Sequence, residues 1–312
     1  MLHPVLPRDD LTPAVPTPPA LTPPPELEAL RQRMVELEEE SGAKALAVSL
    51  FDTETHFAFE YKADRWFHAA STIKVAILLG VYAAIHDGSV QKISRLHVRN
   101  RFLSAWDAEP FRVQSERDAN AVVHDAIGKT MRISELARHM IATSSNLATN
   151  LLLDLVGVDR VQRVLEEYDI DGVDVRRGVE DERAHQRGIN NRVTAHGLVS
   201  MMRLIAEERA FSPELSREIL DVLHAQEFRN GIPARLPSDV RVAHKTGEIS
   251  TVAHDAGVVY PRNRRPYALA VLTEWAPEAT GRTATIAIAS RTIYEFLADH
   301  WSRAADDAEV RT

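Results

Sequence analysis

The chain has 312 residues, of which 45% are hydrophobic and 26% charged, a composition typical of a globular protein with one large domain or two interleaved domains. Its net charge of -8 is spread along the sequence, which gives no electrostatic reason to bind nucleic acid or an anionic membrane and favours a small-molecule partner. Because cysteine is absent, disulfides, thiol nucleophiles and cysteine-based metal sites are excluded.

The first 25 residues contain nine prolines, each of which fixes φ and removes a backbone donor, so they predict an extended or disordered tail over 1–25. The start is not basic and no apolar run follows it, and no stretch reaches the roughly 18 apolar residues needed to cross a bilayer. We therefore expect a cytoplasmic protein without membrane contact, or a periplasmic or secreted one if the true start codon lies elsewhere.

After the tail, apolar residues recur at helical spacing as far as Ser41 and Gly42, which predicts an amphipathic helix that ends there. Segments 43–51 and 56–61 are rich in alternating or β-favouring residues around a polar turn, which predicts a hairpin. Helical patterns recur in the middle of the chain, among them 133–157 and 194–208. Strand patterns return at 239–247, 251–260 and 267–275, and a last helix carries an apolar stripe of Ile286, Ala289, Ile293, Phe296 and Leu297.

Strand patterns at both ends of the chain with helices between them predict an α+β fold. We expect one antiparallel sheet built from 26–66 and 237–303 and flanked by the terminal helices. An all-α domain over 67–236 would be inserted into it, and 304–312 would form a C-terminal tail. No internal repeat is present.

The stretch "AASTIKVAILLG" places Ser71 and Lys74 three positions apart at the head of an apolar run. On a helix this spacing puts both side chains on one face, so the ammonium can approach the hydroxyl. Burial would lower the pKa of the lysine and make it a proton acceptor, as a serine nucleophile requires. The same spacing recurs at Ser41 and Lys44, in a helix-to-strand turn where both side chains are expected to be solvated.

Two further stretches are ambiguous when taken singly. In "TSSNLATNLLLDL", Ser144 or Ser145 has the position of a helix cap, and in "AHKTGEI", Lys245 has that of a solvated lysine at the end of an edge strand. Taken in order, however, Ser-x-x-Lys, Ser-x-Asn and Lys-Thr-Gly each fall in the element that their chemistry needs. The three motifs together therefore favour function over chance.

These motifs resemble those of the serine-active β-lactamase and penicillin-binding protein superfamily, and class A β-lactamases above all, over about Leu27 to Trp301. The resemblance implies that Ser71 is the acylated nucleophile, that Lys74 belongs to the proton relay, and that Ser144 passes a proton to the leaving nitrogen. It also implies an oxyanion hole made by the backbone N–H groups of Ser71 and Glu248. By the same resemblance, the residues expected to bind the substrate are Asn146, Lys245, Thr246, Gly247 and Glu248.

The resemblance further calls for a glutamate that activates water for deacylation, and Glu180 in "RRGVEDERAHQRGINN" has the expected spacing from Ser144. The family pattern Glu-x-x-Leu-Asn is incomplete here, so Asp181 or Glu182 could take the role, and an exposed charged loop is the alternative interpretation. Glu248 stands where the family often has a small residue. Its carboxylate is expected to disfavour anionic β-lactams.

Other motifs do not define a function. "VHDAIGKT" lacks the first glycine of a phosphate-binding loop, no Gly-x-Ser-x-Gly is present, and His244, His254 and Asp255 are a weak basis for a metal site, so neither cofactor nor metal is expected. The leading hypothesis is a serine hydrolase that opens β-lactams through an acyl-enzyme. A D-alanyl peptidase or small-ester hydrolase, and a β-lactam-binding sensor or sink without turnover, are the alternatives. The sequence leaves the oligomeric state undefined.

Overall fold

A computed structural model describes residues 25–309 of the chain, with side chains as far as Asp299. The tail predicted over 1–25 lies outside the described residues except for Pro25, which is the first residue of helix α1 (Pro25–Ser41). The last helix, α9 (Arg282–Glu309), continues past residue 303, where the sequence predicted the folded part to end. Its last turns contain three alanines, Ala304, Ala305 and Ala308, and alanine favours a helix without needing an apolar stripe.

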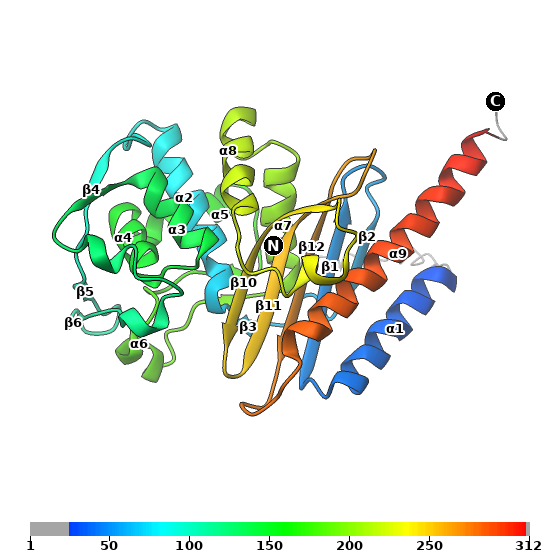
Figure 1. Ribbon diagram of the computed structural model, residues 1–312, viewed down its shortest axis with the longest axis horizontal. Coiled ribbons are helices and arrows are strands. Elements are labelled where there is room, and N and C mark those ends of the chain that lie inside the picture. Colours follow the sequence, from blue (N-terminus) through cyan, green and yellow to red (C-terminus); the bar gives the residue numbers. More distant parts are fainter. Residues whose placement is uncertain (1–24, 310–312) are drawn as a thin grey trace, which may run out of the picture.

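The centre of the molecule is a five-stranded antiparallel sheet with the order β10-β11-β12-β1-β2 (Figure 1). Its strands are β1 (Ala45–Asp52), β2 (Ala58–Tyr61), β10 (Arg241–Ile249), β11 (Val252–Tyr260) and β12 (Tyr267–Glu274). The two ends of the chain meet where β1 pairs with β12, in a register that sets Ala45 opposite Glu274. The antiparallel sheet and the terminal helices confirm the predicted α+β fold.

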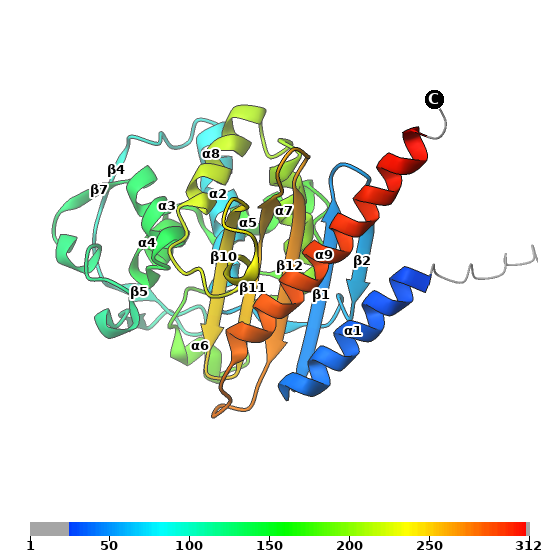
Figure 2. The same cartoon turned by 45° about the vertical axis from the view of Figure 1, so that its right-hand side comes forward.

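The sheet is buried on both faces, which explains why the first four residues of β1 are all apolar. Because side chains alternate along a strand, Leu46 and Val48 point to one core and Ala45 and Ala47 to the other. Helices α1 and α9 lie side by side over the first face (Figures 1 and 2). Helix α7 (Ala195–Ala206) packs on β1, β11 and β12 from the second.

Helix α7 belongs by sequence to 67–236, the stretch predicted as the inserted helical domain, yet it packs on the sheet. The terminal helices cover one face, so the other apolar face needs a helix from within the insertion. The boundaries proposed at 66/67 and 236/237 stay a prediction.

Helix α2 (Lys74–His86) is surrounded by the other helices of the inserted region, and ten of its thirteen residues are buried. A helix that is apolar on all sides must be covered on all sides, as its sequence indicates. The apolar pattern over 133–157 forms two helices, with the break at residues 143–145 where a helix cap was predicted. The remaining helices of the region are α3 (Ile133–Ala142), α4 (Asn146–Val156), α5 (Val158–Glu167), α6 (Glu182–Gln186) and α8 (Pro213–His224).

Short strands also occur in the inserted region, where no strand was predicted. They are β3 (Phe67–His68), β4 (Arg95–His97), β5 (Phe102–Leu103), β6 (Pro110–Phe111), β7 (Thr130–Arg132), β8 (Val173–Asp174) and β9 (Arg192–Val193). Strands of two or three residues are too short for an alternating pattern to show in the sequence.

Candidate active site

Ser71 lies in a 3₁₀ turn, Ala70–Ile73, that leads into α2. The turn starts from a left-handed residue, Ala70 with φ 45°, whose backbone N–H donates to Nδ1 of His68 at 3.1 Å. Thr72 fixes the turn from inside by donating to the carbonyl of Ala69 at 2.6 Å. Within residues 25–299, the Ser71 hydroxyl makes no hydrogen bond, and it lines the cleft. The hydroxyl is therefore available to a substrate.

Lys74 is fully buried, one turn after Ser71. Its Nζ donates to the carbonyl and Oγ of Ser144 at 2.7 and 3.1 Å, and to Oδ1 of Asn146 at 2.7 Å. The expected contact with the Ser71 hydroxyl is not among these bonds, because the long side chain crosses to the turn between α3 and α4 instead. Desolvation lowers the pKa of Lys74 to about 7, although the negative charges of Asp118 and Glu180 oppose the change.

The turn between α3 and α4 separates the roles of its two serines. Ser145 caps α4 by accepting from the backbone N–H of Ala148 at 3.2 Å, so the capping alternative is right for this residue. Ser144 has a left-handed backbone, φ 57°, and turns its hydroxyl toward the cleft instead. There its Oγ accepts from Lys74 at 3.1 Å and from Lys245 at 3.0 Å.

Lys245 on β10 is fully buried, so the alternative of a solvated lysine is wrong. Its Nζ also donates to the carbonyl of Thr246 at 2.8 Å. Burial, with the neighbouring positive charge of Lys74, holds the pKa of Lys245 well below its usual value. Ser144 thus lies between two lysines.

Gly247 explains why the third motif needs a glycine. A Cβ at this position would lie 2.9 Å from the backbone nitrogen of Thr72 and 3.0 Å from that of Ser71. The first distance is shorter than real Cβ contacts and the second is tighter than nearly all of them, so glycine lets β10 run directly against the nucleophile turn.

Glu180 reaches the site, and its side chain is only 8% exposed, so it is not part of a solvated loop face. Its Oε1 accepts from Nδ2 of Asn146 at 2.8 Å and its Oε2 from the backbone N–H of Gln114 at 3.1 Å. Arg117 lies 3.8 Å from the same carboxylate. Since Asn146 also binds Lys74, one amide side chain connects the lysine to the carboxylate.

The two neighbouring carboxylates are placed differently. Asp181 is buried, where it caps α6 and accepts from the hydroxyl of Ser104 and the backbone N–H of Ala105, both at 2.8 Å. The Glu182 side chain is 57% exposed and pairs with Arg117 at 3.1 Å. Of the three candidates, Glu180 is the one bonded to Asn146.

Glu248 stands at the mouth of the cleft, but its charge is paired. Nη2 of Arg282 donates to its Oε1 at 2.7 Å, and Nη1 of the same guanidinium donates to the carbonyls of Ile249 and Ser250 at 2.7 and 3.0 Å. The expected repulsion of anionic ligands is therefore weakened. No motif pointed to Arg282, which lies 34 residues further along the chain at the start of α9.

The cleft extends on both sides of the nucleophile. Pockets of about 390 and 430 Å³ share Ser71, Arg117, Asn146 and Glu248. The first continues past Ser144 and Thr246, and the second past Glu180. Each is of the size that small-molecule sites have.

His244 on β10 and His254 on β11 are both buried. Nδ1 of His244 lies 2.8 Å from Oδ1 of Asp255, both fully buried, and Oδ2 of Asp255 accepts from the backbone N–H of Ile232 at 2.8 Å. Desolvation lowers the pKa of the buried His254 to about 4. Within residues 25–299, no group of three His, Asp or Glu residues is arranged to hold a metal ion. None of the helices between 25 and 309 is long and apolar enough to span a membrane.

Comparison with known proteins agrees with this geometry. Residues 29–297 match the model of the beta-lactamase enzyme family, and the chain belongs to that family. A β-lactamase of Streptomyces fradiae is 29% identical over 270 residues, covering 81% of this chain and 82% of the relative. One from Bacillus licheniformis is 25% identical over 252 residues, covering 78% and 76%.

Solved structures give the same result. A variant of the last common ancestor of Gram-negative class A β-lactamases, bound to a transition-state analogue, is 27% identical with a TM-score of 0.75, covering 87% of this chain and 99% of its own. A mutant of PBP-A, in an acyl-enzyme complex with penicillin G, is 25% identical with a TM-score of 0.75, covering 88% and 99%. The protein is therefore a hydrolase of the class A serine β-lactamase type.

Proposed function

We propose that this enzyme hydrolyses β-lactams through an acyl-enzyme on Ser71. The observation that carries the proposal is Lys74, a fully buried lysine one turn from a free serine hydroxyl, with a pKa of about 7. Near neutral pH a substantial part of such a lysine is uncharged and able to accept a proton. The names of the relatives, and the penicillin bound to the PBP-A mutant, support a β-lactam as the substrate.

Acylation would use the bonds around Ser144. Neutral Lys74 takes the Ser71 proton as Oγ bonds to the lactam carbonyl carbon, and the backbone N–H groups of Ser71 and Glu248 stabilise the oxyanion. When the ring C–N bond breaks, Lys74 returns the proton through the Ser144 hydroxyl, 3.1 Å from Nζ, to the departing nitrogen. Lys245 holds Ser144 from the other side, and its positive charge would attract the substrate carboxylate.

Deacylation would use Glu180. Its carboxylate takes a proton from a water molecule, whose oxygen attacks the ester carbonyl, and the proton returns to Oγ of Ser71 as the C–O bond breaks. The asparagine expected after this glutamate is missing from the loop, and Asn146 supplies an amide at 2.8 Å from Glu180 instead. This contact orients the carboxylate beside the acyl-enzyme.

The test is covalent labelling. Incubation with a fluorescent penicillin, followed by intact-mass analysis and peptide mapping, should show an adduct on Ser71 that disappears with time and is absent from Ser71→Ala. Labelling of Ser71 by an ester probe but not by penicillin would replace the β-lactamase proposal with an esterase or peptidase. A penicillin adduct that never disappears would replace it with a binding protein. Labelling by neither probe would contradict nucleophilic catalysis at Ser71.

A further inference from the structure

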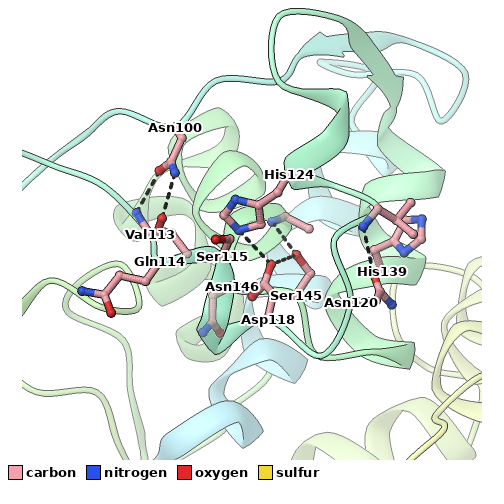
Figure 3. Close-up of polar contacts among 12 residues, drawn as sticks. Asn100, Val113, Gln114, Ser115, Asp118, Asn120, His124, His139, Ser145 and Asn146 are labelled. Carbon is pink, nitrogen blue, oxygen red and sulfur yellow. Dashed lines mark hydrogen bonds and ion pairs between the residues drawn. The ribbon is translucent and has the colours of Figure 1, made fainter.

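A buried carboxylate that no motif identified lies behind the second motif. The side chain of Asp118 is fully covered, and both its oxygens are bonded to the turn between α3 and α4 (Figure 3). Oδ1 accepts from the backbone N–H of Asn146 at 2.6 Å, and Oδ2 from the hydroxyl of Ser145 at 2.7 Å. Asp118 comes from a separate segment that also lines the cleft, so these bonds join that segment to the turn.

The turn that Asp118 holds carries the groups that contact Lys74. Ser144, with its left-handed backbone, offers the lysine its carbonyl and hydroxyl, and Asn146 offers its amide oxygen. A left-handed non-glycine residue is unfavourable unless its surroundings hold it in place. The bonds from Asp118 to the two residues that follow Ser144 supply that restraint.

Asp118 also adds a negative charge to this part of the site. The charged groups that act on Lys74 are Asp118 and Glu180, while the ammonium of Lys245 meets it across Ser144. Behind Asp118, Nε2 of His124 lies 3.4 Å from Oδ2. A negative charge stabilises the ammonium form of a lysine, so Asp118 opposes the effect of burial on the pKa of Lys74.

We propose that Asp118 is a positioning residue of this active site, whose buried carboxylate both holds the turn of Ser144 and Asn146 and places a negative charge near Lys74. The inference rests on the proposed function, because it assumes that Lys74 must lose its proton before Ser71 is acylated. A carboxylate that merely capped α4 would affect the rate and the stability. It would leave the pH at which acylation begins unchanged.

The experiment measures single-turnover acylation by a fluorescent penicillin, with enzyme in excess, from pH 5 to 9. In the wild type the rate should rise with pH through the pKa of Lys74. Asp118→Asn keeps the shape of the side chain but removes its charge. We therefore expect the midpoint, the pH at which the acylation rate reaches half of its plateau, to fall by about 1 pH unit. The plateau rate should fall by about tenfold or more because the turn is less firmly held. Asp125→Asn, an exposed carboxylate of the same segment, should match the wild type.

Ser145→Ala separates the two roles. It removes one bond to Asp118 but leaves the charge, so the plateau rate should fall while the midpoint stays. An unchanged midpoint in Asp118→Asn overturns the proposal. If Asp118→Asn does not fold, as circular dichroism would show, a wild-type acylation rate in Ser145→Ala overturns it instead. Failure of the wild type itself to form an adduct contradicts the proposed function, an outcome recognised before any variant is compared.

Discussion

Replacing Lys74 with methionine should change how the stability of the protein depends on pH. The substitution keeps most of the side-chain length and removes the amine. In the unfolded chain a lysine keeps its proton up to about pH 10.5, whereas the folded protein releases it near 7. Between these values the unfolded state binds more protons at this side chain, so the contribution of Lys74 to the free energy of unfolding rises with pH.

The gap between 10.5 and about 7 corresponds to about 5 kcal/mol at about 1.4 kcal/mol per pH unit, of which about 3 kcal/mol falls between pH 7 and 10. Urea denaturation at pH 7, 8.5 and 10 should therefore show that the free energy of unfolding rises more in the wild type than in Lys74→Met. The difference between the two rises from pH 7 to 10 should be about 3 kcal/mol. Lys44→Met is the matched control, since Lys44 follows Ser41 at the same spacing but is exposed. Parallel curves for wild type and Lys74→Met would refute a buried lysine of low pKa.

Three kinetic predictions follow from the same geometry. Lys74→Ala should slow acylation by about 10² to 10⁴ in stopped-flow measurements because the base is lost, and a near wild-type rate would contradict the assignment of Ser71 as the nucleophile. Gly247→Ala should reduce both acylation and thermal stability, since the new Cβ must displace the backbone of the Ser71 turn; an unchanged melting temperature and rate would contradict the close approach. Arg282→Ala should leave the Glu248 carboxylate without its partner, and it should raise KM for a dianionic penicillin several-fold more than for a zwitterionic one. Equal changes in the two KM values would show that the pair of Arg282 and Glu248 does not affect selectivity.

The fold was predictable where a pattern runs over several turns or strands. Strand β1 is apolar at successive positions because both its faces are buried, and α2 is apolar on all sides because helices surround it. The strands of two or three residues carry no such signal. Nor does the sequence show that α7 packs on the sheet, because an amphipathic helix does not specify which apolar surface covers its stripe.

The site was predictable as a set of motifs but not as a set of contacts. Ser-x-x-Lys predicted that the ammonium of Lys74 can approach the Ser71 hydroxyl, whereas the ammonium binds residues that lie 70 and 72 positions away. Such partners are brought together by tertiary packing alone. Asp118 lies in a polar loop without periodicity, and no short-range pattern distinguishes it from its exposed neighbours.

In the proposed reaction, Ser71 is acylated and Glu180 then releases the product. Its most direct test is a time course of intact mass after mixing penicillin with Glu180→Gln, with Glu182→Gln and Asp181→Asn beside it. A Ser71 adduct should form rapidly in Glu180→Gln and persist, while turnover falls by about 10² or more. Release of the adduct by Glu180→Gln at the wild-type rate, or a persistent adduct in Glu182→Gln or Asp181→Asn instead, would contradict it.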